Sequence, residues 1–477
     1  MLRLAADGDG ATMSDTRAVV VIGGGPAAVS AAVEAARHGA GVTLVAEEAI
    51  GGRSTHASLV PSKVLLHLVG ERRVRKVSGR IDAEDLAHVI AEMGRVAEHE
   101  GARLSKRLED AGVAIVRGLA RFVAPDAIEI AREGKATRRE RFDAAVIATG
   151  SVPWFPAGFF GDAAAAGGGR PDGERVLAPR HLRALRDLPR TMMVIGGGAT
   201  GAEATHAFRE LGVEVTWIVD DLGLLPGFDR ELADSLGDVL MERGVKIVHG
   251  KRVTKVARSG ESVTATLDGG RTYSAERAFV AVGRRADTAR LGLDAIGVAV
   301  DARSGAVVVD DALRSTSVPS VLACGDAAGG AFVASKAHVE GWIAGRRAAG
   351  LDAPRVVANG WVETVYSEPE LALVGLSPQR ARFAKRDVDV RTVSFDESVK
   401  GTLHGVGVDR HARGMLRVVC DPETRVVLGA SAIGPHAAEV LGPIAVAVRA
   451  KMTIEELGAA GMAAPTFGEL AGVGGRS

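Results

Sequence analysis

The sequence contains very little cysteine. Among its 477 residues the only two are Cys324 and Cys420, which lie far apart in the chain. This excludes a disulfide framework and a zinc site built on cysteines, and such low usage is typical of a reducing compartment. No His, Asp and Glu residues have the spacing of metal ligands. We therefore expect a cytoplasmic protein without a bound metal.

The sequence also lacks net charge and long apolar runs. Its 59 Lys and Arg residues balance 59 Asp and Glu residues, so no overall field draws the protein to nucleic acid or to an anionic membrane. No apolar run reaches the length of a membrane span, and residues 1–17 lack the apolar core of a signal peptide. Expected partners are small molecules or a second copy of the chain. Residues 1–12 are expected to be a disordered extension before a start at Met13, and the sequence leaves that start open.

Glycine, in contrast, is abundant, and a glycine-rich turn follows an apolar strand at residues 18–22. In this turn Gly23 permits the sharp change of direction and Gly25 lets a pyrophosphate approach the backbone. Small Ala28 allows the following helix to pack closely on the strand, and a strand at 42–46 completes a βαβ unit. The pattern predicts a bound dinucleotide, although a plain glycine turn before a packed helix explains some single matches.

The same pattern returns later in the chain. After a strand at 192–195, Gly196, Gly198 and Gly201 have the full spacing of a dinucleotide-binding turn, and a helix and a strand at 215–219 follow. Two such units about one domain apart predict two dinucleotides, one in each of two domains.

Acidic residues follow the second strand of each unit, where a carboxylate binds the ribose hydroxyls. We assign Glu47 to the first ribose, one residue beyond the aligned position Ala46, and Asp220 to the second. No Arg lies within several residues of Asp220 to receive a 2′-phosphate. The sequence therefore favours NADH as the coenzyme, with NADPH as an alternative.

Two further segments have clear patterns. Residues 83–112 carry apolar side chains at helical spacing, among them Leu86, Ile90 and Met93, and predict a long amphipathic helix. The run at 162–170, rich in Ala and Gly, has the composition of a linker.

Segment 51–63 lies directly after the first βαβ unit and is expected to open a helix. It begins with Gly51 and Gly52, and ten residues later reaches Lys63 in a Pro-Ser-Lys sequence. The segment resembles the G-G-x-C-x4-C-x-P-S-K segment of the flavoprotein disulfide reductases, which include dihydrolipoamide dehydrogenase and mercuric reductase. Ser54 and Leu59 stand where that family has its two cysteines.

The resemblance covers residues 18 to 470 and implies an α/β fold with two Rossmann-like dinucleotide-binding domains and a C-terminal α+β dimerisation domain. An FAD-binding domain (13–155 and 287–355) is split by a linker and an NAD(P)H-binding domain (156–286). The dimerisation domain (356–477) completes a homodimer.

The family motifs also imply site residues, because their positions match in this chain. Those for FAD are Gly23, Gly25, Ala28, Glu47, Gly51, Gly52, Lys63, Ala120, Thr149, Gly150, Gly325 and Asp326. Those for NAD(P)H are Gly196, Gly198, Gly201, Glu203, Asp220 and Gly283. Lys63 and Glu203 match the ion pair near flavin N5, in which the lysine stabilises the negative charge of reduced flavin and the glutamate keeps the lysine charged. The alternative for Lys63 is an exposed helix lysine.

Two family features are missing. Neither Ser54 nor Leu59 can form a disulfide. Ala464 occupies the position of the catalytic histidine in the family's H-P-T-x-x-E motif, although Glu469 is retained. Loss at both positions predicts that the thiol half-reaction is absent.

The chain most resembles the disulfide-free, dihydrolipoamide-dehydrogenase-like NAD(P)H:quinone reductases, with matching segments at 173–177 and 443–448. This implies electron transfer from NAD(P)H through flavin to a quinone or a similar diffusible acceptor. His56 either donates a proton to the reduced quinone or is an ordinary surface histidine of a helix. Alternatives for the whole protein are a catalytically retired FAD-binding scaffold and a specialised NADH oxidase or biosynthetic reductase.

Overall fold

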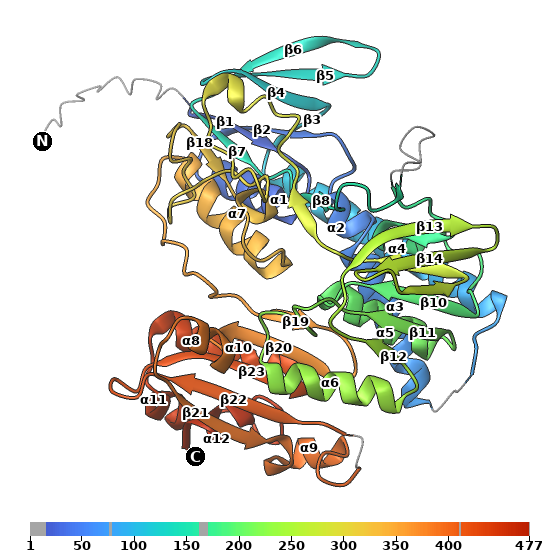
Figure 1. Cartoon of the computed structure of the whole chain (residues 1–477). Helices are drawn as coiled ribbons and strands as arrows, with labels where there is room; N and C mark the ends of the chain where they lie inside the picture. Colours follow the sequence, from blue (N-terminus) through green and yellow to red (C-terminus); the bar gives the residue numbers. More distant parts are fainter. Residues whose placement is uncertain (1–15, 76–78, 162–169, 410–411, 477) are drawn as a thin grey trace, which may run out of the picture.

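The computed structural model describes residues 16–75, 79–161, 170–409 and 412–476 (Figure 1). The predicted extension at 1–12 and nearly all of the predicted linker at 162–170 lie outside these ranges. The α/β fold class is confirmed, with two parallel sheets followed by an antiparallel one. The residue boundaries of the predicted domains stay predictions.

The first parallel sheet has the strand order β18-β7-β1-β2-β3. Its strands are β1 (Ala18–Ile22), β2 (Gly41–Ala46), β3 (Ala114–Arg117), β7 (Ala144–Ile147) and β18 (Val321–Ala323). Helices α1 (Pro26–Arg37) and α7 (Ala334–Ala348) pack together below it in Figure 1. Two glycines of α7 allow this contact, because a Cβ on Gly341 or Gly345 would lie 2.4 Å from a carbonyl oxygen of α1.

The second parallel sheet has the order β12-β11-β10-β16-β9. Its strands are β9 (Val176–Leu177), β10 (Thr191–Ile195), β11 (Glu214–Ile218), β12 (Lys246–Val248) and β16 (Arg277–Val280), with helices α5 (Ala199–Glu210) and α6 (Arg230–Glu242). Strands β8 (Ser151–Pro153) and β17 (Arg284–Ala286) pair antiparallel where the chain passes from the first sheet to the second and back. The second sheet is thus an insertion into the first unit.

Two three-stranded antiparallel sheets accompany the parallel ones. One consists of β4 (Leu119–Ala124), β5 (Ala127–Arg132) and β6 (Lys135–Arg141), and the other of β13 (Val253–Ser259), β14 (Ser262–Leu267) and β15 (Thr272–Ala275).

The C-terminal part is an antiparallel sheet in the order β19-β20-β23-β22-β21. It comprises β19 (Glu363–Val365), β20 (Glu370–Gly375), β21 (Asp389–Ser394), β22 (Met415–Cys420) and β23 (Val427–Gly434). Its helices are α8 (Pro378–Phe383), α9 (Val399–Leu403), α10 (Ala437–Ala450), α11 (Ile454–Ala459) and α12 (Glu469–Arg476).

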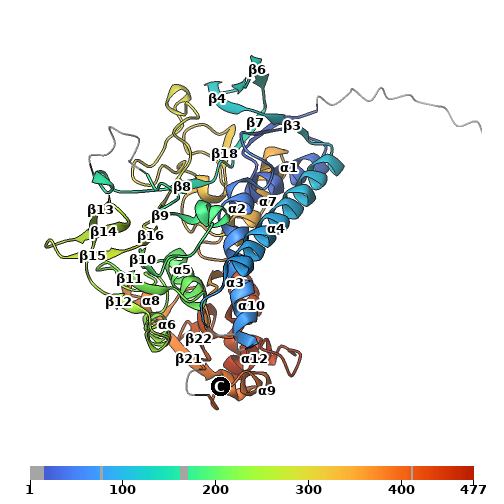
Figure 2. The same ribbon diagram turned by 90° about the vertical axis from the view of Figure 1, so that its right-hand side faces the viewer.

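The predicted amphipathic helix is confirmed as α4 (Ala83–Asp110), with Leu86 and Met93 on its buried face. In Figure 2 it runs beside α3 (Leu59–Val74). None of the helices in the described ranges is long and apolar enough to cross a membrane.

Segment 51–63 opens a helix as expected, and a break divides it into two helices. Helix α2 (Gly52–His56) ends at Ala57, and α3 starts at Leu59 after Ser58, whose φ of −141° is not helical. The physical reason is Pro61, because in a continuous helix its ring would clash with the carbonyl of Ala57 and its nitrogen could donate no hydrogen bond. In the first turn of a new helix neither problem arises.

An ion pair links the inserted unit to the C-terminal sheet. Asp229, which is 3% exposed and caps the N-terminus of α6, lies 3.0 Å from the guanidinium of Arg417 in β22. The same guanidinium lies 2.7 Å from Glu231. Burial raises the pKa of Asp229, and the charge of Arg417 opposes this rise.

Replacing Arg417 with Met should therefore destabilise the protein. The change leaves a buried carboxylate without its counter-charge, at a cost of about 3 kcal/mol. The matched control is Arg230→Met, which removes an exposed pair with Asp234 and should cost less than about 1 kcal/mol. Thermal melting of the purified variants checks this, and equal melting temperatures for the two would contradict it.

Candidate active site

A cavity of about 530 Å³ opens at the carboxyl ends of β1, β2 and β7. This is the edge of a doubly wound sheet at which dinucleotides bind. Many predicted FAD residues line it, namely Gly23, Gly25, Glu47, Gly52, Lys63, Ala120, Thr149, Gly150 and Asp326. Ala28 in α1 is buried, and so is Gly325, which directly precedes Asp326. Gly51 donates its N–H to the carbonyl oxygen of Gly24.

One end of the cavity fits a dinucleotide phosphate. Gly23 has a φ of +129°, and a Cβ there would lie 2.2 Å from the carbonyl oxygen of Ala148. A Cβ on Gly52 would lie 3.1 Å from the nitrogen of Gly25. The backbone therefore closes tightly around the N-terminus of α1, where N–H groups favour an anion. The buried hydroxyl of Thr149, which also lines the cavity, has no hydrogen-bond partner among the described residues, so a bound group could satisfy it.

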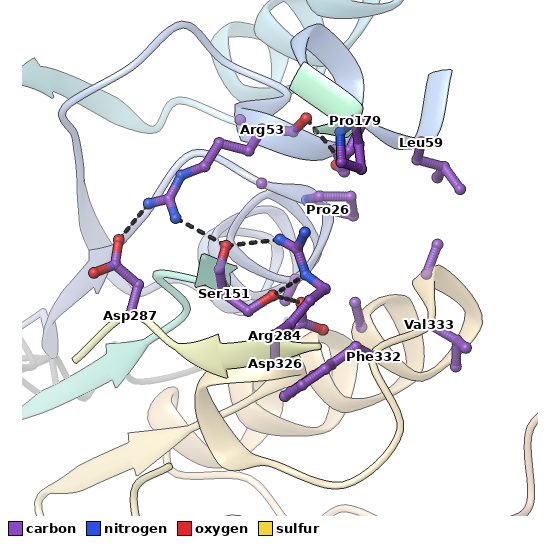
Figure 3. Close-up of a pocket in the computed structure, with 18 of the residues that line it drawn as sticks. Pro26, Arg53, Leu59, Ser151, Pro179, Arg284, Asp287, Asp326, Phe332 and Val333 are labelled. Atoms are coloured by element: carbon purple, nitrogen blue, oxygen red, sulfur yellow. Dashed lines mark hydrogen bonds and ion pairs between the residues drawn. The ribbon is translucent and has the colours of Figure 1, made fainter. Parts of the chain in front are cut away.

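Two arginines that sequence reasoning missed converge in this cavity (Figure 3). Arg53 and Arg284 each donate to the carbonyl oxygen of Ser151, at 2.9 and 2.8 Å. Burial lowers the pKa of Arg284, and the charge of Arg53 adds to this effect. The carboxylates of Asp287 and Asp326 offset part of the positive charge. Two cations at one carbonyl suit an anionic ligand such as a pyrophosphate.

Glu47, the predicted ribose ligand, lines the cavity just beyond β2. Its carboxylate accepts two hydrogen bonds from Arg290, at 2.9 and 2.6 Å. The hydrogen bond from Arg290 lowers the pKa of Glu47, so its carboxylate is charged at neutral pH. The pair joins the two separate parts of the first unit.

Lys63 and Glu203 form an ion pair that lines the cavity. The Lys63 ammonium lies 2.8 and 2.7 Å from the two carboxylate oxygens of Glu203. Glu203 also accepts the backbone N–H of Tyr366 at 3.0 Å, and the Lys63 ammonium is 4.7 Å from the centre of the Tyr366 ring. Because both charged side chains line the cavity and are mostly buried, the pair can hold a positive charge next to a bound cofactor.

The segment between the glycines and Lys63 forms part of the wall. The Ser54 hydroxyl donates to the carbonyl of Gly51, and the Ser58 hydroxyl donates to that of Arg53, so both are used locally. The cavity is also lined by the apolar side chains of Leu59, Pro179, Phe332 and Val333, which are labelled in Figure 3. They suit a planar ring.

The two cysteines are free and buried. Cys324 lines the cavity, and burial raises its pKa, so the reactive thiolate is disfavoured. Cys420 belongs to β22 in the C-terminal sheet.

His56 does not point into the cavity. Its Nε2 lies 2.8 Å from the carbonyl oxygen of Ile50, and its ring packs against Gly101 of α4, where a Cβ would lie 2.9 Å from Cε1. The structure therefore favours the ordinary structural interpretation of His56 over the proton-donor role considered above. The residue two positions earlier, Ser54, faces the cavity because a short helix turns neighbouring side chains to different sides.

The second glycine turn has the same tight geometry as the first. A Cβ on Gly196 would lie 2.2 Å from the carbonyl oxygen of Ala281, and one on Gly201 would lie 2.0 Å from that of Gly196. Gly198 caps the N-terminus of α5. Gly283, with a φ of +141°, immediately precedes β17.

Asp220 follows β11, and the fold brings a basic segment close to this strand end. Arg252 lies 3.7 Å from the neighbouring Asp221, and the N–H of Lys251 is 3.4 Å from the carbonyl of Val219. Both basic residues follow β12, whose carboxyl end lies beside that of β11 in the parallel sheet. Although no Arg lies near Asp220 in the sequence, the fold places Arg252 beside the neighbouring Asp221.

The C-terminal motif lies in a group of rings. Phe467, three residues after Ala464, packs against His436 and His404 with ring centres 5.4 and 5.1 Å apart. Burial, followed by the charge of His436, lowers the pKa of His404. In the described part of the chain, no group of three or more His, Cys, Asp or Glu side chains could hold a metal ion.

Known proteins are similar to this chain over most of its length. The family model described as "Pyridine nucleotide-disulphide oxidoreductase" matches residues 17–344, and the model of that family's dimerisation domain matches residues 362–472. Dihydrolipoyl dehydrogenase 2 of Haloarcula marismortui is 31% identical over 94% of both chains. NAD(P)H dehydrogenase (quinone) of Mycobacterium tuberculosis is 31% identical over 92% of this chain and 89% of its own.

Among solved structures, LpdA from Mycobacterium tuberculosis superimposes with a TM-score of 0.86 at 28% identity, covering 97% of this chain and 99% of its own. The family's use of FAD and NAD(H) agrees with the two glycine turns and the orphaned Thr149 hydroxyl. The chain is an FAD-dependent oxidoreductase and belongs to the pyridine nucleotide-disulphide oxidoreductase family.

Proposed function

We propose that this protein is a homodimeric enzyme that oxidises NADH and reduces a quinone or a similar planar, diffusible acceptor without thiol chemistry. The observation that carries the proposal is the structure of segment 51–63, in which the ends and the middle differ in their resemblance to the family segment. Its two ends retain the glycines and the Lys63–Glu203 pair, while Ser54 and Leu59 form part of the cavity wall. The name of the related mycobacterial quinone dehydrogenase supports it.

Bound FAD supplies the ability to accept a hydride from a nicotinamide and to pass the electrons on. The chain's residues hold and tune it. The N-terminus of α1, Arg53 and Arg284 bind the phosphates, and Lys63 holds a positive charge at the ring end. Glu203 holds the Lys63 ammonium in place through two hydrogen bonds, and the Tyr366 N–H fixes the Glu203 carboxylate.

The acceptor is proposed to stack on the apolar wall at Leu59, Phe332 and Val333. A hydride from NADH and one proton from solvent convert a quinone to its hydroquinone, which balances the reaction. In this scheme the chain needs no group that forms a disulfide or a thiolate.

An acceptor panel tests this proposal directly. Purified holoprotein should be reduced anaerobically by NADH and reoxidised by a quinone such as menadione, with no reductase activity toward lipoamide, glutathione disulfide or mercuric ion. Lipoamide reduction at a rate comparable to quinone reduction would contradict the proposal. Failure of NADH to reduce the flavin would favour a scaffold, and one peroxide formed per NADH even with quinone present would favour an oxidase.

Replacing Lys63 with Met should slow the reduction of the flavin by NADH. The change removes a preorganised positive charge, which is typically worth about 100-fold or more in rate. Stopped-flow absorbance measures the rate, and FAD content should stay unchanged. Lys106→Met, which removes an exposed helix pair with Asp110, is the control and should leave the rate unchanged. Equal rates in both variants would show that Lys63 has no such role.

The basic loop after β12 should allow NADPH to bind as well. We expect the double change of Lys251 and Arg252 to Ser to lower kcat/KM for NADPH by about tenfold, which corresponds to about 1.4 kcal/mol. The value for NADH should change little, because only NADPH carries the 2′-phosphate. Competitive inhibition by 2′,5′-ADP should weaken in parallel, whereas inhibition by 5′-AMP should not. A matched loss for both coenzymes would contradict this role.

A further inference from the structure

Helix α7 carries an ion pair that is almost completely shielded from solvent. The side chains of Lys336 and Glu340 are 3% and 4% exposed, and their charged atoms are 2.9 Å apart. Burial raises the pKa of Glu340, and Lys336 opposes this rise. Charged side chains are rarely buried to this extent, because removing them from water is costly.

Both charged groups hold the same backbone unit. The Lys336 ammonium donates to the carbonyl oxygen of Gly325 at 2.7 Å, and the Glu340 carboxylate accepts the N–H of Gly325 at 2.8 Å. Gly325 has a φ of +64°, and a Cβ there would lie 3.0 Å from the Cβ of Ala27 in α1. The pair therefore clamps a glycine in a tight position between two helices.

The residue after this glycine is a cavity residue. Asp326 lines the cavity, accepts the hydroxyl hydrogen of Ser151 and faces the charge of Arg284. The first turn of α7 also forms part of the wall through Ser335, whose hydroxyl donates to the carbonyl of Val362 at 3.1 Å. A displacement of Lys336 and Glu340 would thus displace the Asp326 carboxylate and one wall of the cofactor cavity.

A role in stability alone explains this pair poorly. Replacing a buried ion pair with apolar side chains is often neutral or stabilising, so such a pair is weak evidence for a stabilising purpose. Its position beside a charged cavity residue points to another role, since a buried charge acts strongly on its surroundings.

We propose that Lys336 and Glu340 are positioning residues of the FAD site: through Gly325 they fix Asp326 against the cavity, and their opposite charges set the midpoint potential of the bound flavin. The inference requires FAD in this cavity and does not depend on which acceptor the enzyme uses.

The test uses holoprotein of three variants. Glu340→Gln keeps the shape of the side chain and an acceptor for the Gly325 N–H, and Lys336→Met removes the opposite charge. The control is Glu34→Gln, which breaks the 3.2 Å pair between Glu34 of α1 and Arg346 of α7. That pair joins the same two helices, but its side chains hydrogen-bond to His38 and Asp352, whereas Lys336 and Glu340 hydrogen-bond to Gly325.

Three measurements are made on each variant: the midpoint potential by equilibration with redox dyes, the dissociation of FAD from diluted holoprotein by flavin fluorescence, and the melting temperature. Glu340→Gln should raise the potential and Lys336→Met should lower it, because reduced flavin gains negative charge. Both should weaken FAD binding by about tenfold, the size of effect seen when residues that orient metal ligands are changed. Glu34→Gln should change the melting temperature only.

The proposal would be overturned if the midpoint potentials of Glu340→Gln and Lys336→Met shifted in the same direction. It would also be overturned if their potentials shifted only as much as that of Glu34→Gln, and the pair would then have a purely structural role. If Lys336→Met does not fold, the decision rests on Glu340→Gln, and an unchanged potential together with unchanged FAD affinity in that variant overturns the proposal. Inactivity with quinones at wild-type potential would instead count against the proposed function and not against this inference.

Discussion

The ion pair between Lys63 and Glu203 joins side chains from α3 and α5, which belong to different parts of the chain, and the backbone of Tyr366 from the C-terminal part binds the same carboxylate. Three structural units therefore meet at one buried charge. This contact can form only if both parallel sheets and the antiparallel sheet take their observed places, so the assembly of the units and the chemistry of the cavity depend on the same geometry. A charge placed at such a junction is also protected from solvent, which strengthens its action on a bound ring.

The elements that could be predicted from the sequence are those in which local pattern and tertiary structure agree. The glycine turns at Gly23 and Gly196 have a clear local pattern and also meet the carbonyl oxygens of Ala148 and Ala281 closely, and α4 has a regular apolar face. The break between α2 and α3 could have been predicted from Pro61 by the same physical reasoning, but only the opening of a helix was predicted for this segment.

Contacts between distant residues could not be predicted in this way. Arg53 and Arg284 meet at Ser151, and Arg252 reaches Asp221, only because of how the strands are ordered. The local sequence around each arginine contains no signal of its partner. For His56 the sequence left a proton-donor role and an ordinary surface position open, and its ring packs against α4. Spacing thus predicted residues that the fold places around one cavity, while the charges that surround them depend on the fold.

The ribbon of β8 and β17 has a consequence for motion. Since Ser151 and Ala286 are paired, the inserted coenzyme unit enters and leaves the first unit at a single point, and this point can act as a hinge. Ser151 and Arg284 lie on the two strands of that hinge and are bound to each other inside the cavity. Any rotation of the coenzyme unit about the ribbon would pull Arg284 relative to Ser151. The position of Arg284 in the cavity is thereby tied to the position of the inserted unit.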